Sequence, residues 1–258
     1  MIVAGVAAAG AISALAYRLR ALTSSGAIAA TVVGAIAFGL GGGMGAGALL
    51  TFFVTSTALS RWRRAVKEAM KFEKGGRRDA GQVLANGGVA AVCLVLSACL
   101  PGYATPLRLA FLAALAAANA DTWGTEIGSA ISGKPYSLRD GKPAVPGTSG
   151  AVSVGGTLAA LAGACIVAIF ARNLGHPSAV LLVAGCGFTG AFLDSVAGAT
   201  LQSQWQDRAT PSRWVETPED DAARNRPDRG LAWVNNDIVN IVCTGSAALL
   251  ALLLSVVW

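Results

Sequence analysis

The segment LRLAFLAALAAANADTWGTEIGSAI, residues 107–131, is long and apolar enough to cross a lipid bilayer, yet it contains Asn119, Asp121 and Glu126. A carboxylate at the centre of a membrane helix costs about 2.5–3.5 kcal/mol on insertion scales. Acidic residues in such segments usually face a cavity, a cation or a substrate rather than lipid. We therefore expect a transmembrane helix here that carries part of a functional site.

The composition of the chain indicates an integral membrane protein. Hydrophobic residues make up 54% of its 258 residues and charged residues 13%, whereas soluble domains contain about 25% charged residues. Several apolar runs approach the ~20 residues that a helix needs to cross the hydrocarbon core. The alternating pattern of a membrane β-barrel is absent, and the 32 glycines suit closely packed helices. We predict an all-α polytopic membrane helical bundle that forms one domain over residues 1–258.

Eight spans are predicted, and the charges between them give an orientation. The spans lie near residues 2–17, 26–41, 43–60, 82–100, 107–131, 150–170, 178–200 and 237–257. Four connecting loops hold 18 of the 20 Lys and Arg residues, and positive residues stay in the cytoplasm. We therefore expect these loops inside and both termini outside. The arginines of the first loop follow the first span instead of preceding it, which predicts a retained helix rather than a cleaved signal peptide.

In this orientation the polar residues of the spans gather near their cytoplasmic ends. They are Gln82, Asn86, Asn119, Asp121, Thr122, Thr125, Glu126, Thr148, Ser149, Ser153, Asp194, Ser195, Gln202, Asn236, Asp237 and Asn240. A helix cap or an interhelical hydrogen bond would explain any one of them. Three acids at one depth, Asp121, Glu126 and Asp194, favour a functional site. We therefore predict a polar chamber that faces the cytoplasm.

Helix geometry separates two of these acids. Residues five apart differ by about 140° around an ideal helix, so Asp121 and Glu126 do not share a face. Either the helix loosens near Trp123 and Gly124, or the two acids have different roles.

The loops that lead into the cytoplasmic helix starts favour an anionic ligand. Residues 71–82, 132–150 and 225–237 are rich in glycine or basic residues. Helix N-termini and glycine-rich backbone bind anions, and Lys or Arg adds positive charge. Carboxylates beside bound phosphates are a common arrangement for Mg²⁺. No segment matches the Walker pattern, which excludes a P-loop enzyme.

Several charged residues also fit a role outside ligand binding. The basic residues of 61–78 agree with positive-inside topology and with attraction to anionic lipid. The acidic run at residues 216–221 is interpreted as a solvated face of the protein.

Five blocks of sequence resemble a known membrane family. They are GGRRDAGQVLANGG, ANADTWGTEIG, PGTSGAVSVGGT, LDSVAGATLQ and VNNDIVN, and they occur in the family's order over about residues 20–257. The family is grouped as transmembrane protein 19-like, also called domain of unknown function 92. It includes the plant and cyanobacterial phytyl-phosphate kinase, which transfers a phosphoryl group, preferably from CTP, to phytyl monophosphate and so feeds tocopherol synthesis. The resemblance implies that its motif residues form the site here, namely Asn86, Asn119, Asp121, Glu126, Ser149, Asp194, Gln202, Asp237 and Asn240.

The residues and the resemblance together predict a CTP-dependent kinase of an isoprenyl monophosphate, either phytyl or geranylgeranyl phosphate. We expect Asp121, Glu126 and Asp194 to be catalytic as Mg²⁺ ligands, with Asp237 as a further ligand. The expected nucleotide- and phosphate-binding residues are Lys134, Arg139, Lys142, Thr148, Ser149, Asn86, Asn119, Gln202, Asn240, Arg77 and Arg78. The expected partners are the lipid bilayer, the isoprenyl monophosphate and the nucleoside triphosphate, and no nucleic acid. Whether the protein is a homo-oligomer stays open.

Three alternative functions agree with the same residues. A CTP-dependent cytidylyltransferase and a lipid-alcohol kinase are close chemical neighbours of the predicted enzyme. A membrane transporter of a cation or a lipid phosphate would also contain buried acids and glycine-broken helices. A transport path, however, needs polar groups near the midplane, and these are scarce. The expected location is the plasma membrane of a prokaryote, or the plastid envelope if the host is a plant.

Overall fold

The computed structural model describes residues 2–62, 77–131, 133–208, 214–218 and 226–255. These residues form seven α-helices, which are α1 (Ile2–Arg18), α2 (Ser24–Arg61), α4 (Ala80–Cys99), α5 (Ala104–Ala130), α6 (Val154–Ala168), α7 (Ala179–Thr200) and α8 (Asn236–Ser255). Two short 3-10 helices, η1 (Pro101–Tyr103) and η2 (Ile169–Leu174), precede α5 and follow α6. The predicted helical bundle is confirmed, and the described residues form seven helices against eight predicted spans.

The difference in number lies in α2, whose two parts correspond to the predicted spans 26–41 and 43–60 and meet at a kink at Gly42. Gly42 has φ 55° and ψ −144°, a conformation that glycine adopts at low cost. A straight helix of this length, 38 residues, would extend about 57 Å. Arg61 at its end nevertheless donates a hydrogen bond from Nη2 to the carbonyl oxygen of Leu19, just before its start. The helix therefore folds back at Gly42 into a first arm, residues 24–41, and a second arm, residues 43–61.

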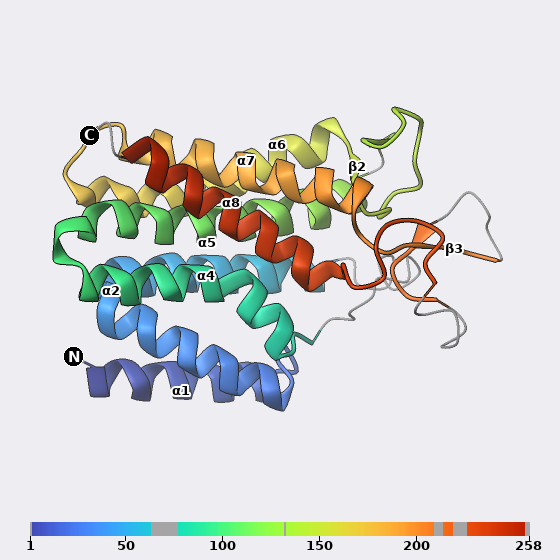
Figure 1. Cartoon of the computed structure of the whole chain (residues 1–258). Coiled ribbons are helices and arrows are strands. Elements are labelled where there is room, and N and C mark those ends of the chain that lie inside the picture. The colour runs from blue at the N-terminus through green and yellow to red at the C-terminus, as the bar shows by residue number, and fades with distance from the viewer. Residues whose placement is uncertain (1, 63–76, 132, 209–213, 219–225, 256–258) are drawn as a thin grey trace.

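Within the described ranges, five helices are long and apolar enough to cross a membrane, namely α2, α4, α6 together with η2, α7 and α8. The helix α5, predicted as a span, is not among them, since charged and amide side chains interrupt its apolar sequence. It occupies the centre of the bundle instead and packs against α2, α4, α6, α7 and α8 (Figure 1). Residues 109–118 of α5 are at most 1% exposed. Neighbouring helices, rather than lipid, therefore surround its apolar half.

Small residues allow the neighbouring helices to approach α5 closely. A Cβ added at Gly187 of α7 would lie 2.6 Å from the Cβ of Ala116. A Cβ added at Gly190 would lie 2.6 Å from the carbonyl oxygen of Cys243 on α8 and 2.9 Å from the Cβ of Ala117 on α5. Glycine at these two positions thus sets the spacing between α5, α7 and α8, as is common where membrane helices pack closely.

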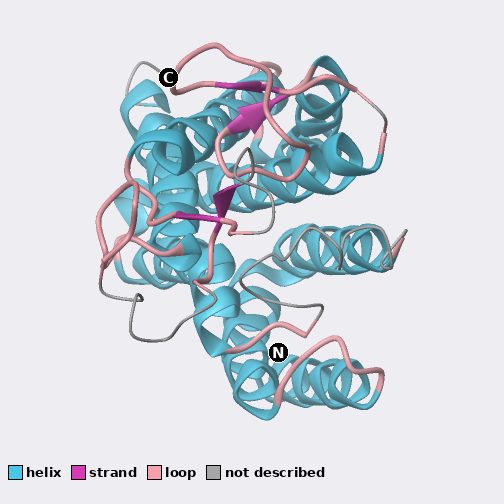
Figure 2. Ribbon diagram, turned by 90° about the vertical axis from the view of Figure 1, so that its right-hand side faces the viewer, coloured by secondary structure: helices cyan, strands magenta, loops and turns pink. Residues whose placement is uncertain are grey.

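The connecting loops gather at one end of the bundle. There β1 (Tyr136–Ser137) pairs antiparallel with β2 (Ala151–Val152), and β3 (Trp205–Gln206) pairs antiparallel with β4 (Trp214–Val215). Figure 2 views the bundle from this end, with the short strands lying over the helix ends. The first and last helices reach the opposite end, where both chain ends lie (Figure 1). Which end faces the cytoplasm stays a prediction.

The packing around α7 predicts different effects for one substitution at two glycines. Gly190→Leu should lower the melting temperature of the detergent-solubilised protein, because overpacking a tight contact costs about 1–3 kcal/mol or more. Gly185→Leu is the matched control, since a Cβ at Gly185 meets nothing within 4 Å. Equal melting temperatures for the two variants would contradict this account of the packing.

Candidate functional site

A polar cavity of 450 Å³ lies at the end of the bundle that carries the loops. Its walls come from the second arm of α2, the start of α4, the adjoining half of α5, the 146–153 loop, the start of α6, α7 and the start of α8. The cavity brings together eight of the predicted site residues, which are Arg78, Asn86, Asp121, Glu126, Thr148, Ser149, Asp194 and Asn240. Residues separated by up to 162 positions in the sequence thus meet in one polar space, as the sequence predicts.

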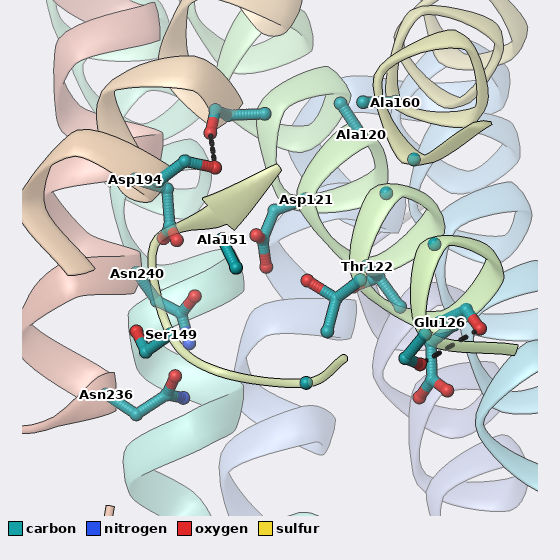
Figure 3. A pocket seen from close by; sticks show the side chains of 18 of the residues that line it. Ala120, Asp121, Thr122, Glu126, Ser149, Ala151, Ala160, Asp194, Asn236 and Asn240 are labelled. Atoms are coloured by element: carbon teal, nitrogen blue, oxygen red, sulfur yellow. Dashed lines mark hydrogen bonds between the residues drawn. The ribbon is translucent and has the colours of Figure 1, made fainter. Parts of the chain in front are cut away.

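The centre of the polar cavity is a pair of facing carboxyl groups. Asp121 projects from α5 and Asp194 from α7 into the same space (Figure 3), close enough to interact directly. The Oδ2 atom of Asp194 is buried and accepts no hydrogen bond from the described residues. Two facing carboxylates repel each other unless a proton or a cation lies between them. This pair is therefore a ready acceptor for a cation.

The pair fits Mg²⁺ that arrives with a phosphate ligand better than a preformed metal site. The described part of the chain contains no group of three or more His, Cys, Asp or Glu side chains that could hold a metal ion. Mg²⁺ in proteins is commonly bound by one or two carboxylates together with water and substrate phosphates. Asp121 and Asp194 could supply two such carboxylates, and phosphate oxygens and water would then have to complete the coordination.

The two other predicted metal ligands are not part of this pair, although Glu126 acts electrostatically on Asp121. Glu126 lines the cavity one and a half turns farther along α5, as its spacing predicts, and interacts electrostatically with Arg78. Asp237 does not line the polar cavity, and its Oδ2 atom lies against Gly81 at the start of α4. The predicted cluster of four carboxylate ligands is therefore not assembled in this structure.

Arg78 is held rigidly in the cavity wall by its backbone. Its N–H donates to the carbonyl oxygen of Ala21 at 2.9 Å, and its own carbonyl accepts from the N–H of Thr23 at 2.9 Å. Its guanidinium lies 5.6 Å from the centre of the Phe52 ring. Burial lowers the pKa of the Arg78 guanidinium, and the Glu126 carboxylate opposes this effect. Because arginine is always protonated in proteins, the cavity wall carries a fixed positive charge.

Ser149 and Gln202 hold the 146–153 loop against α7. The Ser149 hydroxyl donates to Oε1 of Gln202 at 2.5 Å, and Nε2 of Gln204 donates to the carbonyl oxygen of Gly198 at 2.9 Å. Gly150, with φ 75°, lies directly against Ala199 and leaves no room for a side chain. Ser149 lines the polar cavity, whereas Gln202 stays outside it. Gln202 therefore positions the loop from behind the cavity wall.

Asn119 lies outside the polar cavity, where it links three helices. It is fully buried, and its Nδ2 donates to the carbonyl oxygen of Gly163 on α6 at 2.7 Å. Its Oδ1 accepts from the Thr55 hydroxyl of α2 at 3.0 Å, and Thr55 accepts from Nε1 of Trp123 at 3.2 Å. The interhelical hydrogen bond, rather than ligand binding, explains this residue.

Besides Asn119 and Gln202, four predicted phosphate-binding cations lie outside the cavity lining. Lys134, Arg139 and Lys142 are exposed, and Nη1 of Arg139 donates to the carbonyl oxygen of Ala199 at 3.4 Å. Arg77 is also exposed, and its Nη2 donates to the carbonyl oxygen of Leu22. The structure thus does not bring these four cations to the polar cavity.

The helix starts are less open to anions than the sequence suggests. The Asp79 carboxylate accepts from the N–H of Gln82 in a capping box at the start of α4. At the start of α6 the Ser153 hydroxyl accepts from the N–H of Gly156. These caps satisfy part of the first-turn N–H groups that would otherwise bind an anion.

Four charged or amide residues of the cavity wall are not among the predicted ligand-binding residues, namely Arg61, Gln82, Glu216 and Asn236, although Gln82 and Asn236 belong to the predicted polar chamber. In the sequence Arg61 is counted only among the loop charges that indicate orientation. Its position at the end of a predicted span, next to the polar chamber, could have indicated that it lines the cavity. The acidic run predicts a solvated face for Glu216, but this residue lies close enough to Asp194 to act on it electrostatically. Residues 219–221 of that run lie outside the described residues.

The network around Asn119 predicts a structural effect. Asn119→Leu should lower the melting temperature, because the buried carbonyl of Gly163 loses its donor at a cost of about 1–3 kcal/mol. Asn86→Leu is the control, since Nδ2 of Asn86 donates to the carbonyl oxygen of Gln82 within the same helix. If Asn119→Leu unfolds at the wild-type temperature in detergent, the network does not hold the helices together.

Comparison with known proteins places the chain among membrane proteins. The sequence profile of the family described as Integral membrane protein DUF92 matches residues 7–248. Protein PGR of Arabidopsis thaliana is 32% identical over 213 residues, covering 72% of this chain and 74% of that protein. Protein VTE6, chloroplastic, from the same plant is 27% identical over 241 residues, covering 90% and 65%. An uncharacterized membrane protein of Methanocaldococcus jannaschii is 30% identical over 184 residues, covering 71% and 76%.

No solved structure matches the chain. The family profile covers all the helices that form the polar cavity, from α2 to the cavity-lining start of α8. The resemblance predicted from the five sequence blocks is confirmed, and the chain belongs to the integral membrane protein family DUF92.

Proposed function

We propose that this protein is a kinase that transfers the γ-phosphoryl group of CTP to an isoprenyl monophosphate, with Mg²⁺ as cofactor. The observation that carries the proposal is the facing pair of Asp121 and Asp194 in one polar cavity with the cation Arg78. The family resemblance supports the reaction, since the family includes a phytyl-phosphate kinase. A lipid acceptor also gives a reason for a kinase to reside in a membrane.

The reaction requires little covalent chemistry from the protein. A phosphate oxygen of the acceptor lipid forms a bond to the γ-phosphorus of the nucleotide. The bond from that phosphorus to the β–γ bridging oxygen breaks, and CDP leaves with the electron pair. Because the acceptor oxygen is already ionised, no strong general base is needed. Positioning and neutralisation of charge therefore supply most of the catalysis.

The cavity residues divide these tasks between them. Asp121 and Asp194 would hold Mg²⁺ against the nucleotide phosphates, where the metal neutralises developing negative charge. Ser149, Asn236 and Asn240 lie beside the carboxylate pair (Figure 3) and offer hydrogen bonds to a phosphate or to the ribose. Arg78 lies in the wall that carries Glu126 and supplies positive charge to a second phosphate group.

The packing of α5 favours an enzyme over a transporter. Beyond the polar cavity, residues 109–118 of this central helix are at most 1% exposed, and all are Leu, Ala or Phe. A transport path would need polar groups and space at this level of the bundle. The tight apolar packing there supports a site that opens at one end of the bundle.

The proposal predicts a specific pair of products and a specific loss in two variants. Protein in nanodiscs with Mg²⁺, CTP and phytyl or geranylgeranyl monophosphate should yield lipid diphosphate and CDP. Both products are measured by mass spectrometry. Asp121→Asn and Asp194→Asn should each lower turnover by about 10²-fold or more, as is typical when one preorganised charge contact to a transition state is lost. Asp140→Asn is the control, because Asp140 is exposed and outside the cavity.

Other outcomes of the same experiment separate the alternatives. Pyrophosphate with a CMP-linked lipid would identify a cytidylyltransferase, and preference for the free alcohol would identify a lipid-alcohol kinase. Absence of turnover of either monophosphate with CTP, ATP, GTP or UTP by folded protein would overturn the kinase. Wild-type turnover in both aspartate variants would show that the cation site is misplaced.

A further inference from the structure

A second cavity, the apolar groove, adjoins the polar cavity between α1, the two arms of α2 and α4. The wall from α1 contains Ala9, Ser13 and Ala16, which share one helix face. The first arm of α2 contributes Ala30 and Val33 from one face of its own. The volume available is 70 Å³, against 450 Å³ in the polar cavity. The apolar groove therefore suits one slim chain rather than a polar head group.

The two cavities share four wall residues, namely Phe52, Arg78, Gln82 and Asn86. Phe52 is 6% exposed, and the Arg78 guanidinium packs over one face of its ring. The amide side chains of Gln82 and Asn86 lie one turn apart on α4. At this junction a fixed cation and two amides thus stand between an apolar groove and a polar cavity.

We propose that the apolar groove holds the isoprenoid chain of the acceptor, with its monophosphate at Arg78, Gln82 and Asn86. The inference rests on the proposed kinase and assigns the acceptor to a subsite separate from the nucleotide. A lipid monophosphate has an anionic head joined to a slim hydrocarbon, and the junction offers this same order of charge and apolar surface. Burial of each CH₂ group of the chain contributes about 0.8 kcal/mol to binding.

The positions of the charged groups give the two substrates opposite places in the polar cavity. Arg78 interacts with Glu126, which also acts on Asp121, whereas Asp194 interacts with Asp121 and not with Arg78. A nucleotide with Mg²⁺ belongs at the carboxylate pair, and a metal-free monophosphate belongs at the arginine. The acceptor phosphate would then face the γ-phosphate across the cavity.

The length of the groove limits which part of the chain it recognises. From Ala9 to Ala16 the groove follows α1 for about 10 Å, roughly the length of two isoprene units, at 1.5 Å rise per residue. The units next to the phosphate are therefore enclosed by protein. A longer chain extends past the groove, so chains beyond this length should bind with similar affinity.

Two adjacent residues of the first arm provide a matched test. Val33 is buried in the groove wall, whereas Val32 is 53% exposed. Val33→Phe should raise the KM for geranylgeranyl monophosphate by about tenfold or more, because the blocked groove forfeits the burial of several CH₂ groups. A five-carbon prenyl monophosphate, measured as a competitor, should keep its inhibition constant within about twofold, since one isoprene unit buries few of those groups. Val32→Phe should change neither constant, and Ala30→Leu serves as a milder groove variant if Val33→Phe does not fold.

Arg78→Gln tests the other end of the acceptor. The Arg78 backbone, not its side chain, bonds to Ala21 and Thr23, so this variant should fold. This variant should bind monophosphates of every chain length more weakly, by a similar factor. Loss of affinity that grows with chain length in Arg78→Gln would contradict the assignment of phosphate to this residue.

A binding experiment that needs no turnover separates this inference from the proposed function. A geranylgeranyl monophosphate bearing a diazirine in its first isoprene units is photolysed on the wild-type protein, and labelled peptides are mapped by mass spectrometry. Labels on α1 and the first arm of α2, lost in Val33→Phe and kept in Val32→Phe, support the groove even if no kinase activity is found. Labels confined to α6 and α7, or equal labelling in both variants, overturn it even if the kinase is active.

Discussion

The enclosure of α5 by five other helices is the constraint on which the site depends. A helix with Asp121 and Glu126 facing lipid would be costly to insert. The bundle surrounds the apolar half of α5 with α2, α4, α6, α7 and α8, and residues 109–118 are almost fully buried. Alanine on α5 and glycine on α7 make this enclosure tight. The polar half of the same helix can then open into a cavity whose walls are protein.

The enclosed helix gives the cavity two electrically distinct sides. One side is the Asp121 and Asp194 pair, where a buried carboxylate oxygen accepts no hydrogen bond from the described residues. The other side is Arg78, whose backbone is fixed by hydrogen bonds and whose guanidinium packs against the Phe52 ring. A phosphoryl transfer needs a metal-bound donor and an acceptor phosphate brought together, and these two sides supply complementary charge for each. Phe52 belongs to the second arm of α2, which follows the kink at Gly42.

Sequence patterns predicted the helical bundle, the gathering of polar residues at one end and eight of the residues that line the cavity. They divide the spans 26–41 and 43–60 at residue 42, where Gly42 separates the two arms of α2, but they could not predict the conformation of this glycine. They also could not separate ligand-binding from packing amides. Asn119 and Asn240 both belong to blocks shared with the family, but only the three-dimensional neighbours show that Asn119 bonds to Gly163 and Thr55. Lys134, Arg139 and Lys142, which we expected to bind phosphate, do not line the cavity. The spacing of residues in a sequence does not determine the direction that a loop takes.

The central claim is that Asp121 and Asp194 jointly hold a divalent cation together with a nucleotide. Electron paramagnetic resonance of Mn²⁺, used in place of Mg²⁺, measures this directly on purified protein with and without CTP. The account predicts that CTP strengthens Mn²⁺ binding to the wild-type protein, and that the Asp121→Asn, Asp194→Asn double variant loses this effect while remaining folded. Nucleotide-dependent Mn²⁺ binding that is unchanged in the double variant would contradict it.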